Sequence, residues 1–201
     1  MNKKPSADPA ALRILLIDDF TGRAAILEQA LSDAGHRIIA RLSSTLDLPQ
    51  QVHALQPDVV IIDLDSPDRD TLENMSIVTR DNPRPIILFS SQDDSDTIQK
   101  AVRAGVSAYV VDGLSAKRVR PIIDVAIARF REFQAMRIEL EKTRDQLSER
   151  KLIERAKGLL MKQRGFDEDQ AYQALRKLAM DRNQRLIQAA QNVIDIFEML
   201  G

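Results

Sequence analysis

The sequence contains no cysteine and no tryptophan, and aromatic residues make up only 4% of it. Without cysteine the chain has neither disulfide bonds nor thiolate metal sites, which are common supports of small secreted domains. Hydrophobic residues still make up 44% of the chain, so the core must be built mainly from aliphatic side chains. These features fit a globular protein of a reducing compartment.

Long apolar runs are also absent. No segment approaches the roughly 20 apolar residues that a membrane-spanning helix needs. Lys3 and Lys4 near the N-terminus are not followed by the apolar region of a signal peptide. We therefore expect a cytoplasmic protein that has no membrane partner.

Neither sign of charge dominates the chain, because 29 lysines and arginines and 30 acidic residues leave a net charge of −1. The chain therefore has no overall basic charge that would bind nucleic acid without regard to sequence or shape. Any nucleic acid must be recognised by a limited part of the surface. The length of 201 residues suffices for one ordinary domain and a smaller one.

Short apolar segments typical of buried parallel strands alternate with helical segments between Arg13 and Val111. Residues 1–11 show no periodicity and are predicted to be a disordered lead-in. Because strands that alternate with helices form parallel sheets through right-handed crossovers, we predict a doubly wound α/β domain with a five-stranded parallel sheet. The predicted strands are 13–17, 36–42, 59–63, 85–90 and 108–111, and the predicted helices are 23–34, 46–55, 70–79 and 95–104.

From Ser115 onward the pattern is helical almost to the end, with breaks near Gly165 and at 181–183. Ser115 is a candidate N-cap. Pro121 lies past the first turn of a helix that begins there, so the start of the regular helix stays open between Ser115 and Arg120.

The last part of the chain is predicted to be a compact unit of three helices. Asp167 and Gln170 have the spacing of a capping box for the second helix. Met161 and Met180 are predicted to be packing residues of the core rather than contacts to a ligand. Further core positions, spaced along one face of each helix, are Ile153, Ala156, Leu160, Ala171, Leu175, Leu178, Leu186, Ala190, Val193 and Phe197.

Apolar residues of the long helical stretch recur at alternating steps of three and four. This short heptad seam favours a parallel coiled-coil homodimer through a linking helix at 129–147. An alternative interpretation is a single amphipathic helix docked on its own domain, because the seam is brief and includes Arg137 and Thr143. The seam consists of Phe130, Phe133, Met136 or Arg137, Leu140, Thr143 and Leu147.

Three carboxylates are placed where predicted strands end. Asp18 and Asp19 follow the first strand, and Asp63 ends the third. Ligands bind at the carboxyl ends of strands in open α/β sheets, and clustered carboxylates repel one another unless a hard cation such as Mg²⁺ lies between them. A carboxylate beside that ion can attack a phosphoryl group, and Ser90 at the end of the fourth strand would offer a hydroxyl to its oxygens. Each acidic residue alone could instead cap a helix or end a strand.

This placement of acidic and hydroxyl residues, together with the run GVSAYVV at 105–111, resembles the receiver domain of two-component response regulators. The resemblance covers residues 12–128, and Pro67, four residues past Asp63, also matches it. By this resemblance the phosphoacceptor is Asp63, the metal-binding residues are Asp18 and Asp19 together with Asp63, the switch hydroxyl is Ser90, and the aromatic residue that reorients with it is Tyr109.

Asp112 departs from the receiver pattern, which typically has a lysine just after the fifth strand to pair with the acyl phosphate. A carboxylate at this position would oppose a phosphoryl group that bears about two negative charges. Mg²⁺ or Lys117 could offset part of the repulsion. We expect phosphorylation to be absent or dispensable and the domain to serve as a docking surface.

The run from Leu147 to Ile194 resembles the ANTAR domain of the AmiR and NasT family of transcription antitermination regulators. Its matching motifs are ERAKGLLM at 154–161, the break at Gly165 and AYQALRKLAM at 171–180. The resemblance implies an RNA-binding domain at 148–201 that binds hairpins in nascent leader mRNA and lets RNA polymerase read past a terminator. Within the family, the whole chain resembles the nitrate-responsive regulators, which implies nitrate or nitrite assimilation genes as targets and a NasS-like nitrate-sensing protein as partner.

From Ser148 onward there are ten lysines and arginines and eight acidic residues, a surplus of two. This surplus is too small for indiscriminate binding to the phosphate backbone of nucleic acids. It fits recognition of a shaped RNA loop whose unpaired bases are contacted individually, and a dimer would double these contacts. Any one basic residue could instead belong to a solvated face. Phe166 and Tyr172 are the aromatic candidates for base stacking. The candidate RNA contacts are Lys157, Arg176, Lys177, Arg182 and Arg185.

Two other functions stay open. One is a phosphorylation-controlled regulator that binds DNA, although the tail has no strongly basic recognition helix. The other is a protein-interaction adaptor without a nucleic-acid partner. Apart from phosphoryl transfer onto Asp63, we expect no enzymatic turnover, because His36 and His53 lie apart and form no catalytic constellation.

Overall fold

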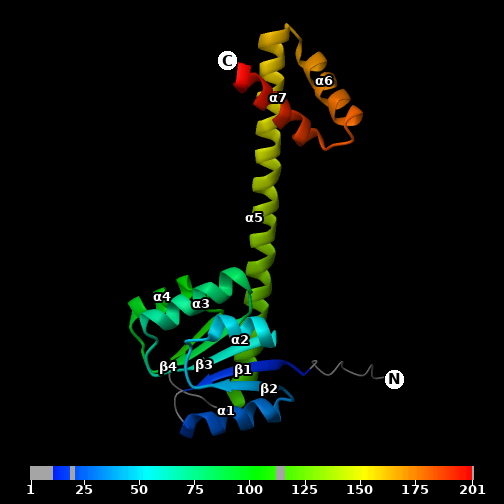
Figure 1. The fold of residues 1–201 in the computed structure, drawn as a ribbon. Coiled ribbons are helices and arrows are strands. Elements are labelled where there is room, and N and C mark those ends of the chain that lie inside the picture. Colours follow the sequence, from blue (N-terminus) through cyan, green and yellow to red (C-terminus); the bar gives the residue numbers. More distant parts are fainter. Residues whose placement is uncertain (1–10, 19–20, 112–115, 201) are drawn as a thin grey trace, which may run out of the picture. The chain divides into compact units, whose positions relative to one another are not determined.

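The structure is a computed structural model that describes residues 11–18, 21–111 and 116–200, without the side chains of 21–24, 116 and 200. Its first part alternates strands and helices in the order β1 (Arg13–Asp18), α1 (Thr21–Asp33), β2 (Arg37–Leu42), α2 (Leu48–Leu55), β3 (Val59–Asp63), α3 (Arg69–Asp81), β4 (Ile86–Ser90), α4 (Ser95–Arg103) and β5 (Ala108–Val111). The strands form one parallel sheet in the order β2-β1-β3-β4-β5 (Figure 1), which confirms the predicted doubly wound α/β class. Every strand and helix predicted for this domain is present, with bounds that agree within two residues.

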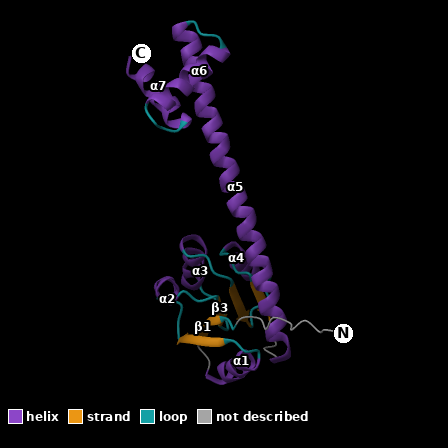
Figure 2. Cartoon of the chain, turned by 90° about the vertical axis from the view of Figure 1, so that its right-hand side faces the viewer, coloured by secondary structure: helices purple, strands orange, loops and turns teal. Residues whose placement is uncertain are grey.

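Buried aliphatic side chains fill both faces of this sheet, because successive residues of a strand point to opposite faces. On one face, Leu15 and Ile17 pack against α2, α3 and α4. On the other, Ile14 and Leu16 pack against α1 and the first turns of α5 (Ala116–Arg164). Figures 1 and 2 show α2, α3 and α4 on one side of the sheet and α1 on the other. All four strand residues are fully buried.

The helix α5 is 49 residues long and continues without a break through the predicted domain limits at 128 and 147. It begins at Ala116, the early end of the range left open by the sequence, and contains Pro121. A proline inside a helix removes one backbone hydrogen bond. Val119 and Ile123 on either side of it are buried against the sheet, which stabilises the helix in spite of that loss. None of the described helices combines the length and the apolar composition needed to cross a membrane.

A second compact unit follows Gln134 and contains three packed helices. The end of α5 packs there with α6 (Glu168–Asp181) and α7 (Leu186–Leu200). The core positions predicted from helical spacing all belong to one hydrophobic cluster, which confirms that prediction. Its buried members are Ala156, Leu160, Ala171, Leu175, Ala190, Val193 and Ile194, and its half-buried members include Ile153, Leu178, Leu186 and Phe197.

The turn between α5 and α6 follows local sequence signals. Gly165, directly after α5, has a φ of 71°, a left-handed conformation that glycine adopts without a steric penalty. The side chain of Asp167 accepts a hydrogen bond from the backbone N–H of Gln170 at 2.7 Å, and the side chain of Gln170 accepts one from the backbone N–H of Asp167 at 3.1 Å. The predicted capping box is therefore confirmed.

The prediction that Met161 and Met180 are core residues is wrong. Their exposed fractions are 40% and 71%. Each follows directly on a residue that does fill the core, Leu160 or Ala179, and one step along a helix turns a side chain by more than a quarter of a turn. The inward position is therefore taken by the neighbour, and both methionines lie on the surface.

Gly105, between α4 and β5, has a φ of 91°, and a Cβ atom there would lie 2.4 Å from Cγ2 of Thr79. We expect Gly105→Ala to lower the free energy of unfolding by about 2–4 kcal/mol, because left-handed backbone and overpacking both cost energy. Gly35→Ala is the matched control, since Gly35 has a φ of 79° but nothing within 4 Å of the added atom. Urea unfolding of both variants measures the difference. Equal losses would mean that Thr79 moves aside without cost.

Candidate functional sites

Two buried carboxylates, Asp18 and Asp63, which we term the acidic pocket, lie at the carboxyl edge of the sheet, where β1 and β3 end beside each other. Asp18 and Asp63 are register partners on these strands and are only 3% and 1% exposed. Side chains of register partners in neighbouring strands project to the same side of the sheet. The structure thus brings together the first and third of the predicted strand-end carboxylates. Asp19 and Asp112 lie outside the described residues.

A chain of hydrogen bonds connects Ser90 with Tyr109 through Gln92. The Oγ atom of Ser90 accepts a hydrogen bond from the backbone N–H of Gln92 at 3.2 Å and donates one to the carbonyl of Asp65 at 2.8 Å. The hydroxyl of Tyr109 donates to the carbonyl of Gln92 at 2.9 Å. The two predicted switch residues therefore contact the same loop after β4, and Ser90 also contacts the loop after β3.

Arg41 on β2 is a pocket residue that the sequence interpretation missed. Its Nη2 atom lies 3.8 Å from Oδ2 of Asp18, and its Nη1 atom lies 3.3 Å from Oε1 of Glu28 on α1. The Asp18 side chain is fully buried, whereas the side chains of Arg41 and Glu28 are 38% and 41% exposed. The guanidinium thus bridges a buried and a partly exposed carboxylate. This contact becomes foreseeable only once β2 is known to lie beside β1.

The described part of the pocket offers oxygen ligands from two carboxylates, Asp18 and Asp63. Mg²⁺ commonly binds proteins through one or two carboxylates and keeps several waters, so this donor set fits the ion. A bound Mg²⁺ would offset the negative charge of the pocket. Within residues 11–18, 21–111 and 116–200, no group of three or more histidine, cysteine or acidic residues is placed to hold a metal. Arg41 adds a positive charge where the ion would bind.

Lys157, a predicted RNA contact, is buried between two helices, with only 7% of its surface exposed. Its Nζ atom donates to Oε1 of Glu168 at 2.7 Å and to the two carboxylate oxygens of Glu154 at 3.0 and 3.1 Å. The hydrogen bonds that Lys157 donates to Glu168 and Glu154 raise the pKa of Lys157, and the bond to Glu168 lowers the pKa of that carboxyl. Since the carboxyl pKa is lowered, the stabilisation is present at neutral pH and is lost as acid protonates Glu168. Lys157 thus connects α5 to α6 through an ion pair. The prediction that it contacts RNA is wrong, because its side chain is buried in a structural contact.

The other four predicted RNA contacts are exposed and form what we term the basic surface, Arg176, Lys177, Arg182 and Arg185. The first two lie on the outward side of α6, and the last two lie between α6 and α7. Arg185 donates to Oε1 of Glu149 at 2.6 Å. The other three have no ion pair among the described residues and can therefore bind an external anion.

Tyr172 adds an aromatic ring to the edge of the basic surface. Its exposed fraction is 41%, whereas Phe166, the other candidate for stacking, packs on the core of the three-helix unit. Tyr172, Arg176 and Met180 follow one another at steps of four on α6 and form one ridge. An exposed ring beside a guanidinium can stack on an unpaired base while the charge contacts a phosphate. The ridge therefore has the chemistry to bind single-stranded nucleotides.

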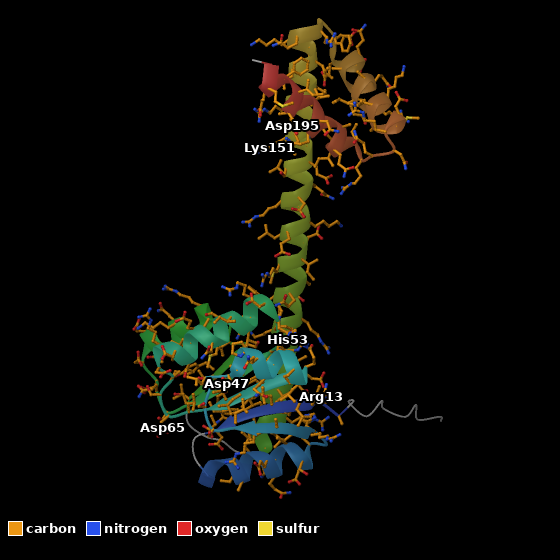
Figure 3. The ribbon with its side chains drawn as sticks, in the orientation of Figure 1. Arg13, Asp47, His53, Asp65, Lys151 and Asp195 are labelled. Atoms are coloured by element: carbon orange, nitrogen blue, oxygen red, sulfur yellow. The ribbon has the colours of Figure 1, made fainter. Side chains whose placement is uncertain are left out.

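An apolar stripe is exposed on α5 within the second unit. Figure 3 draws the side chains that project from this helix. We define it by Met136, Leu140 and Leu147, whose exposed fractions are 59%, 52% and 54%. Leu147 and Ala156 are nine residues apart, about two and a half helical turns, so they project from opposite sides of the helix. Because Ala156 belongs to the core of the three-helix unit, the apolar stripe faces away from that core.

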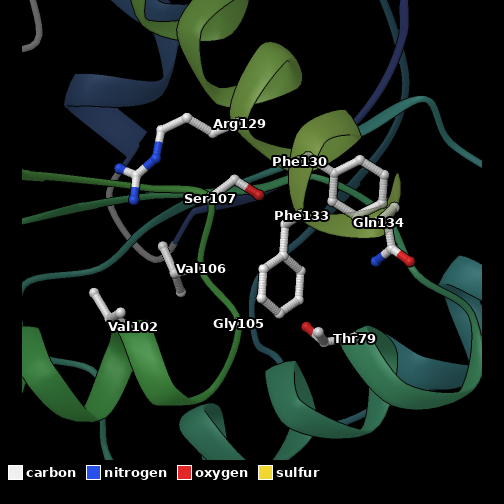
Figure 4. A pocket seen from close by; sticks show the side chains of 9 residues that line it. All are labelled: Thr79, Val102, Gly105, Val106, Ser107, Arg129, Phe130, Phe133 and Gln134. Carbon is white, nitrogen blue, oxygen red and sulfur yellow. The ribbon is translucent and has the colours of Figure 1, made fainter. Parts of the chain in front are cut away.

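A cavity of about 140 Å³ lies at the amino edge of the sheet. Figure 4 shows the side chains that line it. Phe130, Phe133 and Gln134 of α5 line it together with Gly105 and Ser107, which precede β5. The Nε2 atom of Gln134 is buried there and has no hydrogen-bond partner in the described part of the chain. The lining is mainly apolar and contains no acidic or nucleophilic cluster, so the cavity is a packing feature beneath α5 rather than a reactive centre.

Comparison with known families gives two matches along the chain. Residues 14–124 match the response regulator receiver domain. Residues 141–194 match the ANTAR domain. The first match coincides with the five-stranded sheet and its helices, and the second with the exposed part of α5 and the three-helix unit.

The chain is 30% identical to the transcriptional regulatory protein PdtaR of Mycobacterium tuberculosis over 183 residues, which cover 91% of this chain and 89% of that protein. It is 38% identical over 85 residues to a nitrate regulatory protein of Klebsiella oxytoca, covering 42% of this chain and 22% of that protein. The fold is similar to the signal receiver domain of a modulated diguanylate cyclase from Desulfovibrio desulfuricans, with a TM-score of 0.54, 22% identity, and coverage of 60% of this chain and 97% of that one. The chain therefore belongs to the ANTAR response regulators, in which a receiver domain precedes an ANTAR domain.

Proposed function

We propose that this chain regulates transcription by binding hairpins in nascent leader mRNA, so that RNA polymerase reads past a terminator. The observation that carries the proposal is the basic surface of the ANTAR domain together with the exposed ring of Tyr172. Three of its four cations are free of ion pairs among the described residues, and the ring lies one helical turn from Arg176. Cations and an aromatic ring on one ridge suit the unpaired bases of a loop.

The modest charge of the tail favours a shaped RNA over duplex DNA. From Ser148 onward the surplus of positive charge is two, and Lys157 and Arg185 are already paired with glutamates. Tight binding to the backbone of duplex DNA depends on many lysine and arginine contacts to phosphates. A few cations next to a stacking residue suffice when a loop presents its bases individually.

We expect Arg176→Ala to weaken binding to a leader hairpin about tenfold or more, because each contact to a base or phosphate contributes ~1–3 kcal/mol. Gel shifts at fixed salt measure the change. Lys100→Ala is the matched control, since it removes the same charge from the receiver domain, where Lys100 pairs with Asp96, and should leave RNA binding unchanged. Binding of the wild type to duplex DNA as tightly as to the hairpin, or no effect of Arg176→Ala, would contradict the proposal.

The proposed target genes are those of nitrate or nitrite assimilation, and the proposed partner is a NasS-like nitrate-sensing protein that docks on the receiver domain. The 38% identity to the nitrate regulatory protein of Klebsiella oxytoca supports the link to nitrate. Asp112 directly follows β5 in the sequence, where the receiver pattern has a lysine, and supports control by docking, because a carboxylate in place of that lysine would disfavour a phosphoryl group on Asp63. In the same gel shifts, a NasS-like partner should release the hairpin and nitrate should restore binding.

The proposed active form is a parallel homodimer joined along the apolar stripe. Met136, Leu140 and Leu147 leave more than half of their surfaces exposed, which is unusual for neighbouring large apolar side chains of a single chain. Their spacing of four and seven residues is that of a heptad seam. Two chains joined there would present two basic surfaces to a pair of hairpins.

A further inference from the structure

Arg41 places a fixed positive charge in the acidic pocket. Its Nη2 atom lies 3.8 Å from Oδ2 of Asp18, whose side chain is fully buried. We propose that this guanidinium is the resident cation of the pocket and competes with divalent metal ions for Asp18. The proposal concerns the receiver domain alone and does not rest on RNA binding.

The environment of Asp18 favours an ion pair with Arg41. A buried carboxylate has lost most of its hydration and needs an opposite charge nearby. Arg41 is suited to that role because its guanidinium does not lose its proton in proteins. Glu28 on α1 holds the other side of the guanidinium, with Oε1 at 3.3 Å from Nη1. The side chain therefore cannot swing away from Asp18 without also leaving Glu28.

A divalent ion bound to Asp18 would lie close to the guanidinium of Arg41. Mg²⁺ requires oxygen ligands at about 2.0–2.1 Å in near-octahedral geometry, so it must approach the Asp18 carboxylate closely. Two cations on one buried carboxylate repel each other through a medium that screens charge poorly. The strand order β2-β1-β3 places Arg41 beside Asp18, with Asp63 on the far side of β1. The competition therefore acts on Asp18 rather than on Asp63.

Calorimetric titration of the full-length protein with MgCl₂ tests the proposal. Arg41→Gln should bind Mg²⁺ about tenfold more tightly than the wild type, because a unit charge is removed from the immediate surroundings of the ion. Arg37→Gln is the matched control: Arg37 is an exposed arginine at the other end of β2, and its loss should leave the affinity unchanged. Asp18→Asn should weaken binding and should abolish the gain in the double variant with Arg41→Gln.

A second measurement uses the wild type and needs no substitution. In a ¹⁵N NMR titration, the Nε–Hε signal of Arg41 should shift with the same midpoint as the calorimetric binding of Mg²⁺, as the guanidinium is displaced. An Arg41→Gln protein whose affinity is equal to or weaker than that of the wild type would overturn the proposal. A wild-type Arg41 signal that stays unchanged while Mg²⁺ saturates the acidic pocket would also overturn the proposal. This outcome can be observed even if the Arg41→Gln variant fails to fold.

Discussion

Replacing Leu175 by alanine is expected to unfold the three-helix unit at temperatures where the receiver domain remains folded. Leu175 is fully buried in the core of that unit. Loss of a buried leucine side chain costs about 2–5 kcal/mol, and a unit of this size has only about 3–5 kcal/mol of stability. Scanning calorimetry should therefore show the transition of the receiver domain at its usual temperature, while hairpin binding is lost.

Met180→Ala is the matched control on the same helix. Met180 is 71% exposed, so its truncation should change the free energy of unfolding by less than about 0.5 kcal/mol. A uniform shift of all transitions in Leu175→Ala would mean that the two compact units unfold together. That outcome would contradict their separate stability.

A double substitution on the apolar stripe, Leu140→Asp with Leu147→Asp, is expected to convert the proposed dimer to a monomer. Four carboxylates would then face one another along the seam, and their repulsion would replace the burial of four leucines. Light scattering coupled to size exclusion measures the mass. Binding to a paired hairpin should weaken about a hundredfold, since the second contact would no longer be intramolecular.

Ile138→Asp provides the control for this pair. Ile138 is 62% exposed and lies nine residues before Leu147, so it projects from the opposite side of α5. It should leave the mass unchanged. A wild type that stays monomeric at high micromolar concentration would refute the dimer, and a dimeric double variant would place its interface elsewhere.

Local sequence patterns predicted most of the fold. Continuous aliphatic runs such as VVII at 59–62 have few alternatives to a buried parallel strand. The capping box at Asp167 and the glycine at Gly165 depend on neighbours within a few residues, so the sequence alone located the start of α6. Asp18 and Asp63 could be brought together because the ends of parallel strands share one edge of a sheet.

The errors concern interactions between residues distant in sequence. Lys157 belongs to the motif ERAKGLLM at 154–161, but its burial depends on the contact with Glu168 of the next helix. Arg41 resembles any exposed arginine until β2 is placed beside β1. Met161 was misplaced because the spacing of apolar residues does not show which of two neighbours, Leu160 or Met161, points into the core. Such contacts require the strand order and helix packing, which composition and spacing do not specify.

The opposite placement of the apolar stripe and the core on α5 affects how this regulator can evolve. Leu147 and Ala156 are nine residues apart and project from opposite sides of one helix, so substitutions at the two positions should have additive effects. The proposed pairing between copies could then be strengthened, weakened or directed to a new partner without refolding the three-helix unit. Pairing along the apolar stripe and folding of the three-helix unit can therefore change independently in evolution, although both depend on α5.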